Sequence, residues 1–179
     1  MKNTEITFPQ TARYDLNHSY ARTTSDQHIV QGVTDLGQAL VGDILFVEQP
    51  FIGRKVRQGE RLLSIQPMDP HGKVIRLRAA VSGEIVAVNP ALEEAPDLPN
   101  ESPYGEGWIV IIKPENLAEL GNLYQADDPA FAAWVEKEIE AAQLYEMRIG
   151  RQVTGRPAPV TAPIAADIVA ASEAYARVA

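Results

Sequence analysis

The alternation of apolar and polar residues is clearest over residues 61–83, where apolar segments at 62–65 and 74–77 flank a short polar stretch. Within that stretch, Asp69-Pro70-His71-Gly72 has Asp, Pro and Gly at the positions that a type I turn prefers. The pattern predicts a β-hairpin with a type I turn and a glycine bulge, in which glycine adopts a positive φ. Lys73 is then the first residue of the returning strand, beside the tip.

A second pattern occurs twice. Residues 42–50 (GDILFVEQP) recur as residues 83–90 (GEIVAVNP), with Gly, an acidic residue, Ile, further apolar residues, a polar residue and Pro. Two copies are too few for a solenoid and predict a compact fold with approximate two-fold symmetry. Other possible short strands, at 20–22, 27–30 and 55–56 with Gly-rich turns between them, favour a small barrel or sandwich.

Helical spacing is found in three further segments, and their ends carry capping residues. The predicted helices are a short one capped by Asp35 with Gln38 as the return partner, one over residues 114–124, and one from Asp128 to Gly150. Residues 91–102 (ALEEAPDLPNES) are acidic and interrupted by Pro, which predicts a loop. Residues 109–112 (IVII) are apolar on both faces, which predicts a buried strand.

The ends of the chain differ from its middle. Residues 1–13 are predicted to be a flexible lead-in and residues 14–150 to be the folded domain. Residues 151–163 are rich in Pro and predict a linker. Residues 164–179 have apolar positions every three or four residues, which predicts an amphipathic C-terminal helix.

Composition narrows the class of protein. With 179 residues, 45% of them apolar, the chain is long enough for one domain with a hydrophobic core. The absence of Cys excludes disulfides, thiol nucleophiles and Cys-ligated metals. A net charge of −8, with no basic patch that stands out along the sequence, argues against nucleic-acid binding and favours a basic protein partner. The start has no apolar signal region and no segment is long enough to span a membrane, so a cytoplasmic location is expected.

Several motifs together resemble one family. They are Gly32-Val33-Thr34-Asp35, residues 42–48 (GDILFVE), residues 82–86 (SGEIV) and residues 88–108, which end in PYGEGW. On these motifs the chain resembles the H protein of the glycine cleavage system, in the lipoyl/biotinyl carrier-domain group, from about residue 14 to about residue 145. The resemblance implies a mainly β (α+β) fold, a flattened barrel-sandwich hybrid of two antiparallel sheets. It also implies pseudo-two-fold symmetry and short peripheral helices, with the C-terminal helix as an extension.

The resemblance implies a carrier and not an enzyme. A lipoate ligase would attach lipoate to a hairpin lysine, expected here at Lys73. The arm would then move an aminomethyl group among a decarboxylase, an aminomethyltransferase and a dihydrolipoyl dehydrogenase. In the family, the lysine follows a Glu-Ser-Val-like run and precedes Ala-Val-Ser-Asp. Here the Glu is absent and the tip is about three residues longer, so the family's lysine column falls on Gly72 when counted back from Ala80. Lys73 can take the role only if the insertion shifts the register.

Other functions stay open. The chain can be a binding or scaffold protein that keeps the fold and has no lipoyl arm, with Lys73 as an ordinary surface residue. It can also carry lipoate for another pathway, such as sulfur oxidation. An enzyme in its own right is disfavoured, because no nucleophile–base or metal-ligand spacing is present.

Two further groups of residues are candidate sites. His71 lies beside Lys73 and could tune the lysine or bind a metal, but a lone turn histidine is commonly solvated, so no metal site is predicted. Four acidic residues could form a docking face for a basic partner, although for each of them a solvated loop position is the more common interpretation: Glu93, Glu94, Asp97 and Glu101.

Overall fold

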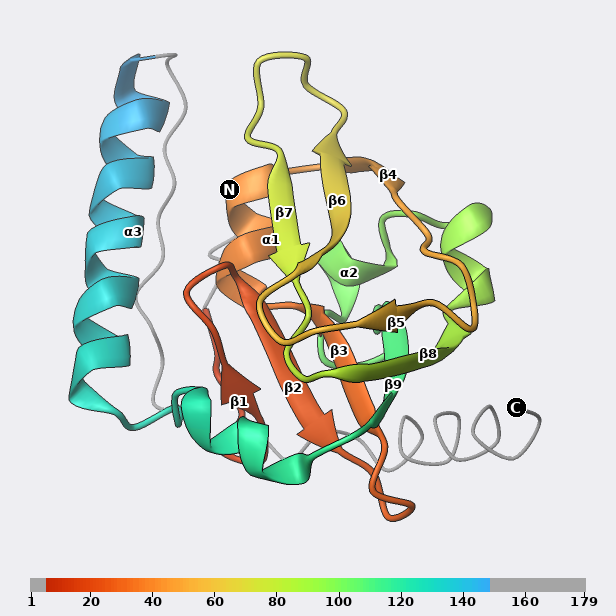
Figure 1. Cartoon of the computed structure of the whole chain (residues 1–179). Coiled ribbons are helices and arrows are strands. Elements are labelled where there is room, and N and C mark those ends of the chain that lie inside the picture. The colour runs from red at the N-terminus through yellow and green to blue at the C-terminus, as the bar shows by residue number, and fades with distance from the viewer. Residues whose placement is uncertain (1–5, 149–179) are drawn as a thin grey trace.

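Two antiparallel sheets form the centre of the protein, and helices lie around them (Figure 1). The computed structural model describes residues 6–148. The predicted linker over 151–163, the helix over 164–179 and the helix end at Gly150 therefore lie outside the described residues.

The larger sheet has six strands. Its order is β1 (Arg13–Tyr14), β2 (Ser19–Thr23), β3 (Ile29–Val33), β9 (Val110–Pro114), β8 (Gly83–Val88) and β5 (Lys55–Val56). The smaller sheet has three strands, in the order β4 (Ile44–Val47), β6 (Arg61–Pro67) and β7 (Ile75–Arg78). All pairings are antiparallel, so the prediction of a mainly β fold built from two antiparallel sheets is confirmed.

The base of the predicted hairpin is part of the core. Leu63 and Ile65 of β6 and Leu77 of β7 are completely buried, and they belong to one apolar cluster with Ile85 and Ile112 of the larger sheet. The buried strand predicted around residues 109–112 is β9. Because apolar side chains from both sheets fill one core, the hairpin leaves the sheets from a fixed base.

The repeated motif contributes one strand to each sheet. Its first copy contains β4 and its second copy contains β8. The two copies use their first glycine differently. Gly42 has a φ of 75° and ends a helix, whereas a Cβ atom on Gly83 would lie 2.1 Å from the backbone oxygen of Lys113. Glycine is therefore required at position 42 for its backbone conformation and at position 83 for the close approach of two strands.

The helices lie mainly at the periphery. They are α1 (Asp35–Val41), α2 (Leu98–Glu101), α3 (Pro129–Arg148) and the 3-10 helices η1 (Pro90–Glu93) and η2 (Leu117–Asn122). The predicted loop over 91–102 thus contains η1 and α2, and the helix predicted over 114–124 is a shorter 3-10 helix. Asn side chains cap η1 and η2, and Pro residues occupy the first turns of η1 and α2, so short helical turns form without long apolar stripes.

The cap of α1 differs from the prediction. Thr34, and not Asp35, is the N-cap, and its side chain accepts a hydrogen bond from the backbone N–H of Gly37. The Gln38 amide donates to the Asp35 side chain at 2.9 Å. The helix therefore begins one residue earlier than the capping-box pattern predicts.

Helix α3 and the start of the chain share a second apolar cluster. Phe131 of α3 stacks on Tyr14 with ring centroids 5.1 Å apart, and it meets Phe8 edge-on at the same distance. Ile6 and Ala12 are also buried. The flexible lead-in predicted over residues 1–13 therefore differs from the structure at residues 6–13, where apolar side chains pack beneath α3.

The close packing of β8 against β9 at Gly83 can be tested by measuring the stability of a variant. We expect Gly83→Ala to lower the free energy of unfolding by at least about 2 kcal/mol, because the new methyl group would meet backbone that cannot rotate away. Gly121→Ala is the matched control, since no described residue comes within 4 Å of its Cβ position. Urea unfolding of both variants measures the difference, and equal stabilities would contradict the close packing.

Candidate functional site

The hairpin extends beyond both sheets (Figure 1). Its strands are held in register by the pairs Leu63 with Leu77 and Ile65 with Ile75. At the turn, the N–H of Gly72 donates to the carbonyl oxygen of Asp69 at 2.8 Å, as expected of a four-residue turn. The hairpin prediction is therefore confirmed.

The role of the turn glycine differs from the prediction. Gly72 does not have the positive φ that a glycine bulge requires. A Cβ atom at this position would instead lie 2.7 Å from the Cβ atom of Pro67. The glycine is needed because the returning chain passes close to a proline ring on the outgoing side.

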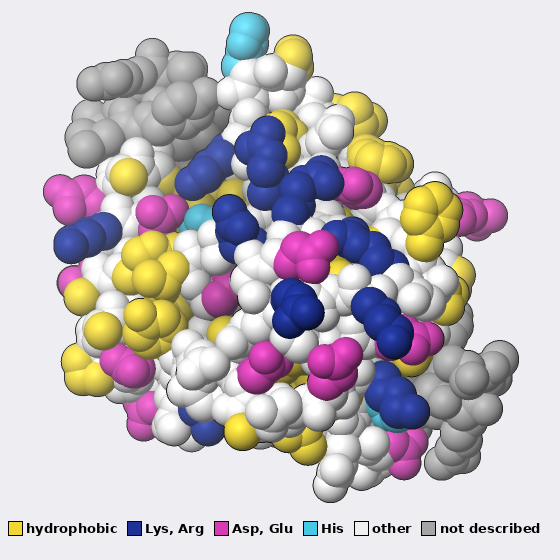
Figure 2. Space-filling view, viewed as in Figure 1, with side chains coloured by type: hydrophobic (Ala, Val, Ile, Leu, Met, Phe, Trp, Pro, Cys, Tyr) yellow, Lys and Arg dark blue, Asp and Glu magenta, His cyan; other side chains and the backbone are white. Residues whose placement is uncertain are grey.

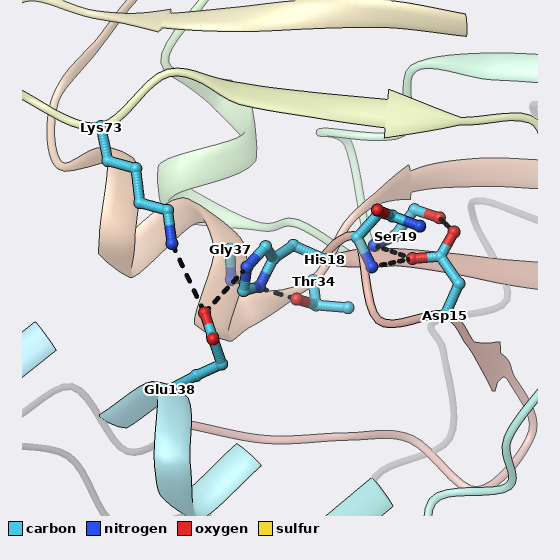
Figure 3. Close-up of polar contacts among 8 residues, drawn as sticks. Asp15, His18, Ser19, Thr34, Gly37, Lys73 and Glu138 are labelled. Carbon is cyan, nitrogen blue, oxygen red and sulfur yellow. Dashed lines mark hydrogen bonds and ion pairs between the residues drawn. The ribbon is translucent and has the colours of Figure 1, made fainter. Parts of the chain in front are cut away.

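Lys73 precedes β7, which begins at Ile75, and so lies in the turn and not in the strand. Its side chain is 49% exposed. The Nζ atom lies 3.4 Å from Oε2 of Glu138 on α3 (Figure 3). The tip of the hairpin is therefore connected to a helix 65 residues later in the chain.

The same carboxylate oxygen meets a histidine. Nε2 of His18 lies 3.2 Å from Oε2 of Glu138, and the His18 ring lies 5.0 Å from that of Trp134. The His18 side chain is 8% exposed, and its buried Nδ1 atom has no hydrogen-bond partner within the part of the chain that the structure describes. A proton on Nε2 lets the ring donate to Glu138 whether the histidine is neutral or charged.

These neighbours change the acidity of Glu138. The hydrogen bond from His18 and the positive charge of Lys73 lower the pKa of Glu138 to about 2, and partial burial opposes them. The carboxylate therefore stays ionised throughout the neutral range, as a fixed negative charge between the helix and the hairpin.

The backbone around His18 is tightly held. His18 has a positive φ of 68°, and its carbonyl oxygen accepts a hydrogen bond from the N–H of Thr34 at 2.8 Å. Asp15 accepts from the backbone of Asn17 and from the hydroxyl of Ser19, at 2.7 and 2.6 Å (Figure 3). Burial raises the pKa of the Asp15 carboxyl, although these hydrogen bonds act in the opposite direction. A closed loop between β1 and β2 therefore fixes the imidazole.

Sequence reasoning missed both His18 and Glu138. A signal for Glu138 exists, because it lies in line with Phe131, Val135 and Ala142, the buried positions of α3. A carboxylate within an apolar helix face indicates a buried partner. For His18 the sequence holds no such signal, since a loop contact with α3 brings it to the site.

The other predicted residues lie away from this carboxylate. The backbone N–H of His71 donates to the Asp69 side chain at 2.9 Å at the exposed tip. The predicted acidic face is exposed on η1, α2 and their connection, and its role as a docking surface stays a prediction: Glu93, Glu94, Asp97 and Glu101.

Two further properties of the described residues bear on other classes of function. Within residues 6–148, no group of three or more His, Asp or Glu side chains could hold a metal ion. No helix in the same part of the chain is long and apolar enough to cross a membrane.

The lowered pKa of Glu138 predicts how the stability of the fold depends on pH. Its carboxylate stabilises the fold fully above pH 4.5, and this contribution is lost as the pH falls toward 2, because the unfolded state then binds the proton first. We expect Glu138→Gln to cost about 1 kcal/mol near neutral pH and progressively less in acid.

Urea unfolding at several pH values measures this difference. Glu140→Gln is the matched control, because Glu140 is exposed on the same helix. A pH-independent cost of Glu138→Gln, or an equal cost for Glu140→Gln, would contradict the assigned interaction.

The sequence has clear relatives. Residues 12–138 match the family model described as glycine cleavage H-protein. The chain is 41% identical over 122 residues to the glycine cleavage system H protein of Bacteroides fragilis, covering 68% of this chain and 94% of that one. It is 39% identical over 119 residues to the protein of the same name from Thermus thermophilus, covering 66% and 90% of the two chains.

The fold agrees with these matches. The structure is similar to the crystal structure of a glycine cleavage system H protein from Mycobacterium marinum, with a TM-score of 0.60 and 29% identity. The similarity covers 69% of this chain and 97% of that one. The matched residues include the hairpin with Lys73 and both partners of its ion-pair network. The chain therefore belongs to the glycine cleavage H-protein family.

Proposed function

We propose that this protein is a lipoyl carrier of a glycine cleavage system and that Lys73 is the attachment residue. The observation that carries the proposal is the position of this lysine. The chain has five lysines, and only Lys73 lies on the hairpin that projects from the sheets. The carrier itself is non-catalytic in this proposal, and its location is cytoplasmic.

The surroundings of Lys73 fit an amide-linked group. A ligase must reach the amine, and half of the side chain is open to solvent. Its contact with Glu138 is a single interaction of 3.4 Å at a partly exposed site, which a modifying enzyme can displace at small cost. Amide formation removes the positive charge of Nζ, so the ion pair with Glu138 is lost while the hydrogen bond from His18 persists.

The protein's own part is to present the lysine. When bound, the lipoyl group would carry an aminomethyl group among a decarboxylase, an aminomethyltransferase and a dihydrolipoyl dehydrogenase. The buried side chains of β6 and β7 fix the base of the hairpin. Pro67 and Pro70 restrict the backbone of the tip. The modified residue is thus held outside the body of the carrier, where several partners can reach it.

A second function is favoured by the same ion pair. If Lys73 is not modified, its contact with Glu138 joins the hairpin to α3, and the protein is a scaffold that keeps the family fold without the arm. The longer tip and the shifted lysine position support this alternative. A carrier for another pathway, such as sulfur oxidation, would use the same lysine with different partners.

Intact-mass spectrometry separates carrier from scaffold. We expect the full chain, co-expressed with a lipoate–protein ligase and supplied with lipoate, to gain the mass of one lipoyl group. Lys73→Arg is expected to abolish the increment completely, because Arg cannot form the amide. Lys55→Arg, at an exposed lysine outside the hairpin, is the matched control and is expected to be modified normally.

Two results would contradict the assignment. An unmodified wild-type chain under these conditions would support the scaffold. An increment that persists in Lys73→Arg would place the attachment at another lysine.

A further inference from the structure

Positive charge is concentrated in one part of this acidic chain. Residues 54–78 carry seven of the sixteen Lys and Arg residues and two of the twenty-four Asp and Glu residues. The segment thus has a formal charge of +5, against −8 for the whole chain. The prediction that no basic patch stands out is therefore wrong for the folded protein (Figure 2), in which Lys and Arg side chains gather over the hairpin strands and around β5.

The strand register places several arginines on one face. In the smaller sheet, Arg61 lies opposite Arg78 and Ser64 lies opposite Arg76. Cross-strand neighbours project from the same side of a sheet, and all three arginines are exposed. Their side chains therefore share the outer face of the three-stranded sheet, opposite the buried Leu63 and its neighbours.

Part of this charge is available to a partner. Arg61 meets Glu48 at 2.8 Å, and Arg78 donates to the carbonyl oxygen of Gly59 at 2.9 Å. Within residues 6–148, Arg76 takes part in none of the ion pairs, and no hydrogen bond of its side chain is found. Among the described residues, the exposed Arg76 guanidinium thus has no ionic partner, and it lies next to two others that are only partly satisfied.

Exposed apolar side chains adjoin these arginines. Phe46 of β4 is 50% exposed and lies opposite Gln66, so it shares the outer face with Arg76. Leu45 and Met68 are 53% and 58% exposed, and the backbone of Met68 is tied to that of Asp43. Hydrophobic side chains follow the edge of the hairpin in Figure 2. A group of large apolar residues exposed together commonly marks a binding surface.

We propose that this surface, the arginine face, docks a partner protein whose own surface is acidic around an apolar centre. The arginine face consists of Phe46, Arg61, Arg76 and Arg78, with Leu45 and Met68 at its edge. Aromatic, Met and Arg side chains are enriched in protein interfaces, and arginine pairs with carboxylates in a planar, two-point geometry. The face lies beside the Lys73 tip, so a docked partner would be next to the lysine. The inference does not require that Lys73 be modified.

Two other partner classes fit the surface less well. A single-stranded nucleic acid binds through phosphate contacts and base stacking, but the apolar residues here are mainly aliphatic and Arg61 is already paired with a carboxylate. An anionic membrane would attract the arginine face but would repel the remainder of this acidic chain. An acidic patch on a protein surface can contact the basic segment without approaching the acidic remainder of this chain.

Nuclear magnetic resonance of the isotope-labelled full chain tests the proposal. The probe is a helical peptide with Glu along its flanks and Leu along its centre. We expect amide shifts confined to residues 45–48, 61–68 and 74–78. We expect Arg76→Glu and Phe46→Ser each to weaken binding about tenfold, because one reverses a charge and the other removes an apolar anchor. Lys137→Glu, at an exposed lysine on α3, is expected to bind as wild type.

The controls and the other possible results each support or overturn the proposed docking surface. Circular dichroism confirms that the variants are folded, and Lys73→Arg is expected to bind normally, which separates this proposal from lipoylation. An absence of shifts at the arginine face, or equal weakening by Lys137→Glu, would overturn the proposal. Tighter binding of a uridine oligonucleotide or of anionic phospholipid vesicles at the same residues would replace the protein partner with nucleic acid or membrane.

Discussion

The structure depends on one apolar contact, the packing of the hairpin base against the larger sheet. Leu63, Ile65 and Leu77 are completely buried against residues such as Ile85 and Ile112. Burying each such side chain contributes roughly 1.5–3 kcal/mol, which is large compared with the polar contacts at the tip. The outer half of the hairpin can therefore be polar, long and exposed, because its position is determined at its base.

The carboxylate of Glu138 is the second point that orients the tip. It accepts from His18 within the fold and from Lys73 at the surface, so one ionised oxygen joins α3, the β1–β2 loop and the hairpin. Modification of Lys73 would remove one of these contacts and leave the other in place. Carrier and scaffold thus use the same geometry and differ in the state of a single amine.

The distribution of charge follows from the topology. The net charge of −8 describes the chain as a whole and conceals a basic segment of residues 54–78. Pairing of β6 with β7 then places alternate side chains of that segment on one face, with Arg76 among them. The acidic residues predicted as a docking face lie on η1 and α2, so the protein has separate exposed surfaces of opposite charge.

The sequence alone determined the hairpin, the short buried strands, the repeated motif and the family, because period-two patterns and turn residues act over a few neighbouring positions. It also singled out Lys73. It did not show that residues 6–13 pack beneath α3, or that Glu138 meets both His18 and Lys73. These are contacts between distant segments, and only the tertiary structure decides which distant side chains share one carboxylate or one sheet face.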